Sequence, residues 1–485
     1  MSAPLLELLL GGLDRQAAAS LQRQIYRLIR DAILQGHLPA DLRMPSTRAL
    51  AGQLQVSRIT TALAYQRLVD EGYLYARAGS GTFVADTLPQ SYQSQPAAAP
   101  AEARLSQRGQ AITARVTGIA RAGGAFVPGV ADAGLFPFHI WKRLHNRYLG
   151  KRHLALTGYV EQGGYQPLRE ALAAYLYAAR AVQCHPRQII ITQGTHQSLD
   201  LIAKLLADPG DEVLVETPCH WGAPVVFAAA GLLARPSGVD GEGACLPALA
   251  PEATPRLAFV TPSHQYPTGN VMSLARRREW LAFAEARKLW LLEDDYDSEL
   301  RYDGEPLPSL QGLDSGQRVI YLGTFSKVTF AGLRLSYLVV PEALAAMFAK
   351  GLTQLYRPGL LPLQAAMADF IQEGHFASHI RKMRAVYAER RSLLQASLRR
   401  HFGERVAFSA GAAGIHLALR VQPPGSARQM IQRAGEFDLT LRGSYPLDEQ
   451  VEDDLLVLGY GGVGAADIEP AVQRLRKLYD AVQQL

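Results

Sequence analysis

The spacing of apolar residues changes along the chain. Ile25, Ile29 and Ile33 recur at four-residue intervals, which predicts one buried face of a helix. The second part of the chain instead alternates short apolar runs with amphipathic stretches, the pattern of parallel strands joined by crossover helices. We expect strands near residues 188–192, 212–216, 256–261, 289–293, 319–323 and 335–340. The pattern predicts an α/β fold with a mostly parallel central sheet, and a smaller α+β part within about residues 359–485.

Two serines are placed to start further helices in the N-terminal segment. Ser46 precedes an amphipathic stretch that reaches residue 54, and Ser57 precedes another that reaches residue 71. A serine hydroxyl at this position accepts a hydrogen bond from a free backbone N–H of the first turn. Residues 72–84 then indicate a hairpin with a glycine-rich tip. This order is typical of a winged helix-turn-helix, in which one helix enters the DNA major groove.

Positive charge is concentrated in the same segment. The net charge of +6 over 485 residues is too dilute to identify a nucleic-acid partner by itself. Residues 21–81, however, contain eight arginines against four acidic residues, a local excess of 8 − 4 = +4. An interaction module whose arginines lie in solvent is the alternative. On the predicted DNA-reading helix we expect these side chains to face outward: Arg58, Thr60, Thr61 and Arg67.

Composition separates two domains. Residues 85–112 are rich in Pro, Gln, Ser and Ala without periodicity, which predicts a linker between domains at 14–84 and 113–485. The chain has 48% hydrophobic and 19% charged residues, which excludes a disordered or fibrous protein. No 18-residue apolar run occurs, and residues 5–10 lack a basic flank, so we expect no membrane partner, no signal peptide and a cytoplasmic location. Three cysteines without CxxC spacing argue against a disulfide framework or a metal site.

One lysine follows an apolar strand directly. In the run Tyr321-Leu-Gly-Thr-Phe-Ser-Lys327 the small polar residues Thr324 and Ser326 precede it, and Arg334 follows. A lone lysine is usually a solvated surface group. A desolvated amine beside polar groups, however, suits Schiff-base chemistry, because burial lowers its pKa and keeps it nucleophilic.

A carboxylate and a phenol lie upstream on another predicted strand. Asp294 and Tyr296 are two residues apart, so on extended chain they share a face and can point at one ring. The carboxylate suits a pyridinium nitrogen and the phenol an adjacent oxygen. A solvated acidic turn or a cation site is the alternative.

A third strand passes through Gly194 into a predicted helix. Free N–H groups at the start of that helix, around Thr195 and His196, can bind a phosphate. Arg334, with Ser326 or Thr324, would complete the phosphate shell.

Residues 21–84 resemble the GntR family of bacterial winged-helix regulators. The resemblance rests on Pro45-Ser-Thr-Arg-Ala-Leu-Ala51, Val56-Ser-Arg58 and Gly79-Ser-Gly-Thr-Phe-Val84. It implies operator DNA as a partner. The family's DNA contacts correspond to Arg48, Ser57, Arg58 and Gly79, to which we add as candidates Ser46, Thr60, Thr61 and Arg77. Ala40-Asp41 stands where the family usually has glycine.

Residues from about 120 to 485 resemble fold-type I pyridoxal-phosphate enzymes of the aspartate aminotransferase superfamily. The resemblance implies that Lys327 forms the Schiff base, Asp294 pairs with the pyridine nitrogen, Tyr296 bonds the phenolic oxygen and Arg334 binds the phosphate. The usual Asn-Pro-Thr-Gly is replaced by Gln265-Tyr-Pro-Thr-Gly269, and we expect Gln265 rather than His264 to take the asparagine's role.

Two more positions depart from that superfamily. His220 holds the place of the aromatic that stacks on the cofactor, with Trp221 as an alternative. The carboxylate-binding arginine is absent around Val457, which leaves Arg442 as a candidate for binding an effector.

Together the two resemblances are those of the MocR/GabR subfamily of transcriptional regulators. They imply a pyridoxal-phosphate-dependent regulator, homodimeric through its large domains, that senses a small amino compound by Schiff-base exchange and catalyses at most a weak transaminase half-reaction. A working aminotransferase with an accessory DNA-binding domain is one alternative. A sensor of the cofactor alone is the other.

Overall fold

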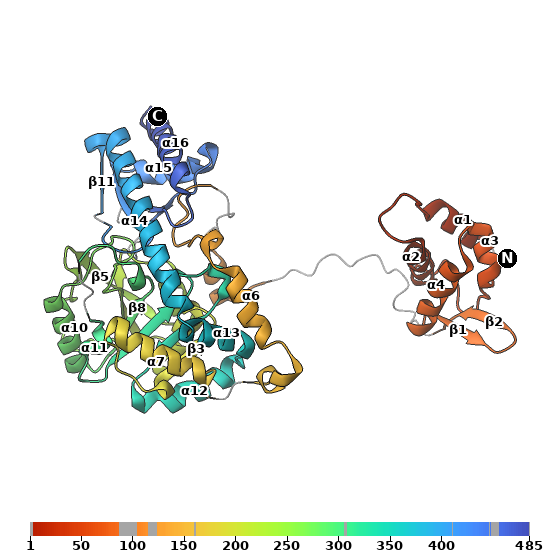
Figure 1. The fold of residues 1–485 in the computed structure, drawn as a ribbon, viewed down its shortest axis with the longest axis horizontal. Coiled ribbons are helices and arrows are strands. Elements are labelled where there is room, and N and C mark those ends of the chain that lie inside the picture. The colour runs from red at the N-terminus through yellow and green to blue at the C-terminus, as the bar shows by residue number, and fades with distance from the viewer. Residues whose placement is uncertain are drawn as a thin grey trace. The chain divides into compact units, whose positions relative to one another are not determined.

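The computed structural model describes residues 3–86, 104–114, 124–159, 162–304, 308–409, 411–445, 447 and 455–484. The chain divides into two compact units, Met1–Ser106 and Gln107–Leu485. Each unit has a hydrophobic core of its own. Figure 1 shows both units and labels many of their helices and strands. No helix in the described part of the chain is long and apolar enough to cross a membrane.

The N-terminal unit is a helix-turn-helix followed by a two-stranded wing. Ser46 and Ser57 cap their helices as predicted, since their Oγ atoms accept from the N–H groups of Ala49 and Thr60, both at 3.1 Å. Leu74 pairs with Val84 at the base of the antiparallel wing. The elements are α1 (Ala3–Gly12), α2 (Leu21–Leu34), α3 (Thr47–Leu54), α4 (Arg58–Asp70), β1 (Leu74–Arg77) and β2 (Gly81–Val84).

Two features of this unit differ from the sequence-based expectation. Helix α1 adds Leu5 and Leu9 to the same core, so the packed unit extends before residue 14, where we expected the domain to begin. The prediction that Thr61 faces outward is wrong. Its side chain is fully buried, and its hydroxyl donates to the carbonyls of Thr47 and Arg58 at 2.9 and 3.0 Å. Thr61 therefore joins α4 to the start of α3 and is not available to DNA.

The C-terminal unit is built on an eight-stranded sheet with the order β3-β10-β9-β8-β7-β4-β5-β6. The pairs from β5 through β9 are parallel, while β10 runs antiparallel to β3 and β9, so the predicted mostly parallel sheet is confirmed. The strands are β3 (Ile189–Thr192), β4 (Glu212–Thr217), β5 (Leu233–Asp240), β6 (Gly243–Ala244), β7 (Leu257–Val260), β8 (Trp290–Asp295), β9 (Val319–Thr324) and β10 (Ser336–Val339).

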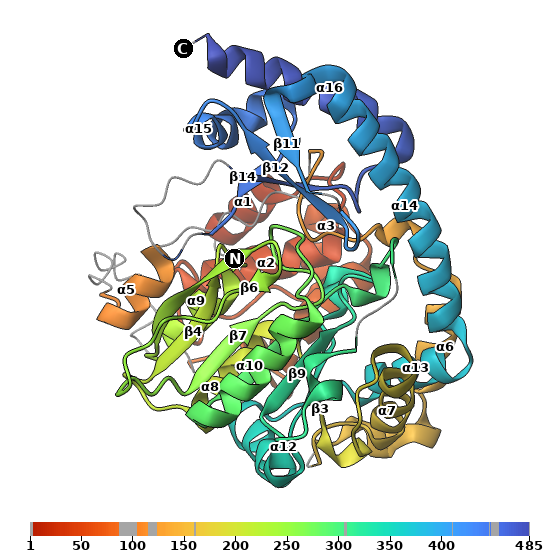
Figure 2. The ribbon, with the colours of Figure 1, turned by 90° about the vertical axis from the view of Figure 1, so that its left-hand side faces the viewer.

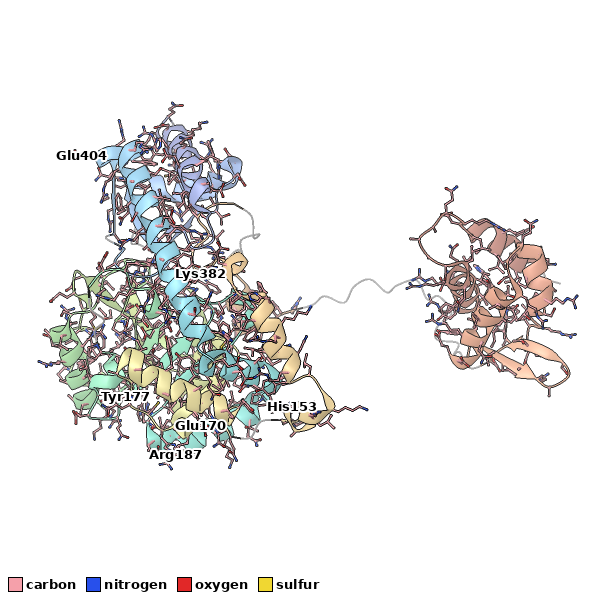
Figure 3. The ribbon with its side chains drawn as sticks, viewed as in Figure 1. His153, Glu170, Tyr177, Arg187, Lys382 and Glu404 are labelled. Atoms are coloured by element: carbon pink, nitrogen blue, oxygen red, sulfur yellow. The ribbon has the colours of Figure 1, made fainter. Side chains whose placement is uncertain are left out.

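Helices cover this sheet, and the surface of this unit carries exposed charged side chains. Glu170, Arg187 and Lys382 are among the exposed charged residues labelled in Figure 3. The helices of this part are α5 (Gln107–Ala114), α6 (Phe138–Arg147), α7 (Gln166–Arg180), α8 (Thr195–Leu206), α9 (Gly222–Ala229), α10 (Leu274–Arg287), α11 (Leu310–Leu313), α12 (Glu342–Tyr356) and α13 (Leu361–Gln372). Helix α5 begins inside the segment that we expected to be a linker and ends two residues beyond it, and it packs against α9.

The smaller α+β part expected within the last third of the chain is present. It contains an antiparallel sheet with the order β11-β12-β14-β13. Helix α14 runs from the region of the large sheet to this small sheet and packs against α16 there (Figure 2). The elements are α14 (His375–Phe402), β11 (Val406–Phe408), β12 (His416–Val421), α15 (Ser426–Arg433), β13 (Arg442–Gly443), β14 (Leu455–Gly459) and α16 (Ala465–Gln483).

Candidate functional site

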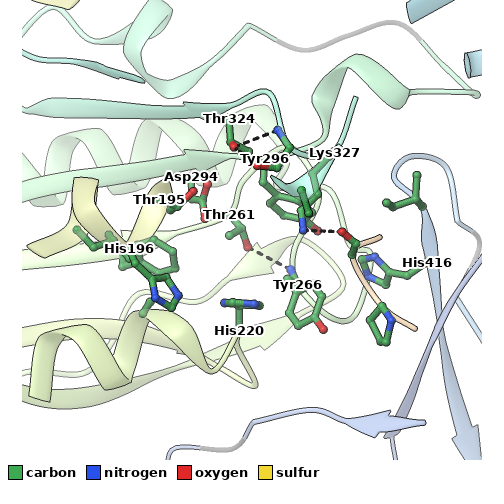
Figure 4. A pocket seen from close by; sticks show the side chains of 18 of the residues that line it. Thr195, His196, His220, Thr261, Tyr266, Asp294, Tyr296, Thr324, Lys327 and His416 are labelled. Carbon is green, nitrogen blue, oxygen red and sulfur yellow. Dashed lines mark hydrogen bonds between the residues drawn. The ribbon is translucent and has the colours of Figure 1, made fainter. Parts of the chain in front are cut away.

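A cavity of about 240 Å³ lies at the carboxyl ends of the parallel strands. Thr261 follows β7, Asp294 lies at the end of β8 and Thr324 ends β9, so the sheet brings together residues that are far apart in sequence. This edge is where open α/β sheets bind ligands. Figure 4 shows the side chains around the cavity. Of the predicted cofactor residues, its lining includes Thr195, His196, His220, Asp294, Tyr296, Thr324, Ser326, Lys327 and Arg334.

Lys327 projects into this cavity from the turn after β9. Its Nζ donates a hydrogen bond to the carbonyl of Gly129 at 3.0 Å (Figure 4). Burial lowers the pKa of the Lys327 amine, and the charges of Asp297 and Asp294 oppose that shift. The amine is therefore held in a desolvated place, where a larger fraction is neutral and nucleophilic than in solvent.

Asp294 and Tyr296 face the same cavity, as the two-residue spacing predicts. Burial, with the neighbouring charge of Asp295, raises the pKa of Asp294 to about 7, and Lys327 opposes this. The Asp294 carboxylate has no hydrogen bond to any residue that the structure describes. Because a buried carboxylate without a donor is costly, the site is suited to a cationic or N–H-bearing ligand group. Tyr296 Oη lies 3.1 Å from His264 Nδ1.

The far end of the cavity gathers hydroxyls and one guanidinium around the start of α8. Arg334 Nη2 donates to the carbonyl of Gln193 at 3.2 Å, beside Gly194. Gly194 has φ +105°, and a Cβ there would lie 2.3 Å from Arg334 Nη2, so only glycine leaves room. Thr324 and Ser326 share a hydroxyl–hydroxyl bond of 3.2 Å. A helix N-terminus beside an arginine and hydroxyls is suited to bind an anion.

The expected role of Gln265 is wrong. Its side chain is buried outside the cavity, where Nε2 donates to the carbonyl of Pro218 at 2.9 Å and to Glu216 Oε2 at 3.2 Å. Tyr266 lines the cavity in its place. The sequence contained the signal, because Tyr266 directly precedes the Pro-Thr-Gly run, where the superfamily has its asparagine.

His220 lines the cavity, whereas Trp221 lines a second one. Burial lowers the pKa of His220 to about 3, so its ring is neutral. The second cavity has a volume of about 390 Å³ and shares with the first the residues Pro128, His220 and Tyr266. Arg442 and Ser444 also line the second cavity. Ser444 Oγ is buried and has no hydrogen-bond partner among the described residues.

The predicted DNA-contacting residues, apart from Thr61, lie on the surface of the N-terminal unit or at its edge. Arg48 on α3 and Arg58 at the start of α4 are exposed, and Thr60 is half-buried. The remaining candidates, all exposed, are Ser46 and Ser57 at the two helix starts and Arg77 and Gly79 on the wing.

One exposed residue at the start of α4 is a further candidate that the sequence analysis did not include. Ile59 lies between Arg58 and Thr60 and is 71% exposed. An apolar side chain left in solvent at this place is suited to contact with a thymine methyl group.

Comparison with known proteins identifies both units. Residues 21–84 match the model of bacterial regulatory proteins of the gntR family, and residues 133–436 match that of class I and II aminotransferases. Such aminotransferase domains typically bind pyridoxal phosphate. The chain is 38% identical to the probable rhizopine catabolism regulatory protein MocR of Rhizobium meliloti, covering 97% of this chain and 96% of that protein. It is 32% identical to the HTH-type transcriptional regulator TauR of Rhodobacter capsulatus, covering 94% and 96%.

Solved aminotransferases share the fold of the C-terminal unit. The α-aminoadipate aminotransferase LysN from Thermus thermophilus superposes with a TM-score of 0.69 at 28% identity, over 75% of this chain and 93% of LysN. The multiple substrate aminotransferase from Thermococcus profundus gives 0.71 at 22% identity, over 78% and 98%, and supports the fold alone. Since these regulators match this chain over nearly the whole of both lengths, the chain belongs to the MocR-type family of transcriptional regulators, and in it a GntR-type helix-turn-helix is fused to a class I/II aminotransferase domain.

Proposed function

We propose that this regulator holds pyridoxal 5′-phosphate on Lys327 and responds to a small amino compound by changing its binding to operator DNA. The observation that carries the proposal is the meeting of an amine, a carboxylate, a phenol and an arginine around one cavity of about 240 Å³. When bound, pyridoxal phosphate supplies an aldehyde that reacts reversibly with amines.

The residues of the cavity fit the functional groups of this cofactor. Asp294, which has no donor among the described residues, would pair with the pyridine nitrogen, and Tyr296 would donate to the phenolic oxygen. Gly194 leaves the space in which Arg334 and the first N–H groups of α8 would bind the phosphate. His220 would lie against the ring as a neutral imidazole, because burial keeps its pKa at about 3.

The second cavity is where we place the remainder of the amino compound. It adjoins the first through His220 and Tyr266 and contains Arg442 together with the Ser444 hydroxyl, which has no hydrogen-bond partner among the described residues. These groups suit a ligand that carries an acidic or hydroxyl group beyond its amine. The usual carboxylate-binding arginine is missing from β14, whose residues 455–459 are Leu-Leu-Val-Leu-Gly.

Loss of cofactor attachment tests the first part of the proposal. Lys327→Ala should abolish the borohydride-reducible, visibly absorbing adduct, whereas Lys204→Ala, which removes a lysine on α8 that pairs with Asp200, should keep it. A reducible adduct that persists in Lys327→Ala would overturn the assignment.

Operator binding with and without amines tests the second part. A panel of amino acids and amino alcohols should contain at least one compound that changes both the visible spectrum and the operator affinity. A ligand shifts a conformational equilibrium only through its different affinities for the two states.

An active aminotransferase is the second candidate, because the fold is that of solved aminotransferases and the proposed cofactor-holding residues line the cavity. Steady production of keto acid at about 1–10³ s⁻¹ without an effect on operator binding would favour it. A response of DNA binding to pyridoxal phosphate alone would instead indicate a sensor of the cofactor.

We also propose that the protein acts as a homodimer through its C-terminal units. Two DNA-binding units on one dimer would then occupy paired half-sites. Light scattering of the full chain gives the oligomeric state, and footprinting gives the spacing of the half-sites.

A further inference from the structure

A buried histidine–carboxylate pair lies behind the cavity. His264 and Asp297 are each 1% exposed, and His264 Nδ1 lies 3.2 and 3.1 Å from Asp297 Oδ1 and Oδ2. The same nitrogen is 3.1 Å from Tyr296 Oη. Neither His264 nor Asp297 is among the described residues that line the cavity. Among the described residues, the hydrogen bond from His264 to a side chain that lines the cavity is the one to the Tyr296 hydroxyl.

The position of one proton follows from these contacts. An ionised carboxylate only accepts hydrogen bonds, so the nitrogen that faces Asp297 carries the proton. The other nitrogen, Nε2, is buried and has no partner among the described residues. A protonated Nδ1 has no lone pair to offer to Tyr296. The single Nδ1–H then lies between Asp297 and Tyr296, which share it in a three-centre hydrogen bond, so the Tyr296 oxygen accepts and its own proton remains for a group inside the cavity.

We propose that His264 and Asp297 are positioning residues that turn the Tyr296 hydroxyl proton into the cavity, toward the phenolic oxygen of the cofactor. Asp297 keeps the proton on Nδ1, and His264 thereby fixes the direction in which Tyr296 donates. This inference rests on the proposed function for its cofactor, but the tautomer of His264 is a property of the protein alone.

The surroundings of the pair support a fixed arrangement. A Cβ at Gly414, which has φ +79°, would lie 2.3 Å from His264 Cε1 and 2.4 Å from Asp297 Oδ2, so the backbone packs closely against both side chains. His416 on β12 faces His264 with 4.9 Å between ring centroids. Its Nε2 lies 3.2 Å from the Pro267 carbonyl. Burial lowers the pKa of His416, so this neighbour is neutral.

The charge of Asp297 also acts on the cavity. Among the charges that raise the pKa of Lys327 against burial, that of Asp297 is the largest and that of Asp294 the second. Replacing Asp297 would therefore change both the pKa of Lys327 and the direction in which the Tyr296 hydroxyl donates. Variants of His264, which leave the Asp297 charge in place, separate the two effects.

The first experiment measures the tautomer directly. ¹⁵N NMR of histidine-labelled full-length protein without cofactor should show His264 protonated on Nδ1 and not on Nε2, with the signal assigned by its disappearance in His264→Asn. Asp297→Asn should remove this preference. A His264 that is protonated on Nε2 alone would overturn the inference, whatever the protein binds.

The second experiment measures the consequence for the cofactor. His264→Leu should weaken pyridoxal-phosphate binding about threefold to tenfold, the range expected for one hydrogen bond, and should raise the pH midpoint of the visible absorbance change. In a Tyr296→Phe background the same substitution should change affinity less than about twofold, because the hydroxyl through which His264 acts is already gone.

Two comparisons keep this result specific. His264→Asn places an amide nitrogen where Nδ1 was and should retain most of the affinity. His401→Leu removes a histidine from another carboxylate pair, with Glu469 at 2.7 Å, and should change neither readout. Equal effects of His264→Leu in both backgrounds would overturn the inference. If His264→Leu fails to fold, His264→Asn and the NMR measurement still test the inference.

Metal analysis supplies a further outcome against the inference. His264, Asp297 and His416 bring possible ligand atoms within 4.8 Å of one another. One tightly held metal ion per chain in the wild type, lost in His264→Asn, would mean that His264 coordinates a metal and does not position Tyr296. If pyridoxal phosphate does not attach to Lys327 at all, the proposed function fails while the tautomer measurement remains valid.

Discussion

Gly194→Ala should remove most of the affinity for pyridoxal phosphate. The added Cβ would lie 2.3 Å from Arg334 Nη2 and 2.6 Å from its Cζ, so the guanidinium must leave its place. A non-glycine residue at φ +105° also costs about 1–3 kcal/mol of backbone strain. The loss of one charge-assisted hydrogen bond to the phosphate costs about 1.5–3 kcal/mol. The loss of this hydrogen bond alone corresponds to a Kd for pyridoxal phosphate that is about tenfold to 150-fold higher.

The assay is a titration of the cofactor-free protein with pyridoxal phosphate, followed by its visible absorbance. Gly238→Ala is the matched control, because a Cβ at Gly238 on β5 meets no atom within 4 Å. Thermal unfolding of both cofactor-free variants separates the strain in the protein from the loss of the phosphate contact. If Gly194→Ala folds and binds the cofactor with the affinity of Gly238→Ala, the assignment of the phosphate site is refuted.

Three further predictions concern DNA and pH. Arg48→Ala and Arg58→Ala should each weaken the free energy of operator binding by about 1–3 kcal/mol, whereas Arg187→Ala on the C-terminal unit should not. Gel-shift titrations at fixed salt measure the affinities, and unchanged binding of the variant that combines Arg48→Ala and Arg58→Ala would exclude α3 and α4 as the DNA surface. Ile59→Ala should leave non-specific DNA binding intact and reduce discrimination at one thymine by about 1 kcal/mol, and a selection from randomised operators that finds the same preference in both proteins would contradict it. In the folded protein the pKa of Asp294 is about 7, against an ordinary value of 3.8, so between these values the folded state binds more protons than the unfolded state. As the pH rises from about 4 to 7, the free energy of unfolding of the cofactor-free protein should therefore fall relative to that of Asp294→Asn, by at most about 1.4 kcal/mol per pH unit. If urea denaturation gives the two proteins the same pH dependence across that range, the burial effect on Asp294 is absent.

The sheet and its polar strand ends could be predicted from sequence because the pattern there is local. Each predicted strand overlaps an observed one, and Asp294, Thr324 and Lys327 reach the cavity because parallel strands end at one edge. Strand β5 was missed because it contains Pro236 and is mostly exposed, so it lacks an apolar run. Helix α5 was missed because its sequence has no strong apolar face, and it packs on α9, which is distant in sequence.

Individual side-chain directions could not be predicted, because contacts from distant segments decide them. Gln265 turns away from the cavity because the carboxylate of Glu216, from β4, accepts its amide. Thr61 turns inward because α3 supplies the carbonyl of Thr47. The pairing of His264 with Asp297 likewise requires the segments that follow β7 and β8 to lie side by side. None of these contacts leaves a periodic signal in the chain.

The wall between the two cavities has a consequence for how such regulators diverge. Pro128, His220 and Tyr266 belong to both cavities, whereas Ile431 and Ser444 line only the second. A substitution at Ile431 or Ser444 alters the shape or polarity offered to an incoming molecule without touching Lys327. On the proposed function, ligand preference would therefore change by single substitutions in a lineage that keeps its cofactor chemistry unchanged. The same separation would give a protein engineer a short set of positions at which to change the amine to which the proposed sensor responds.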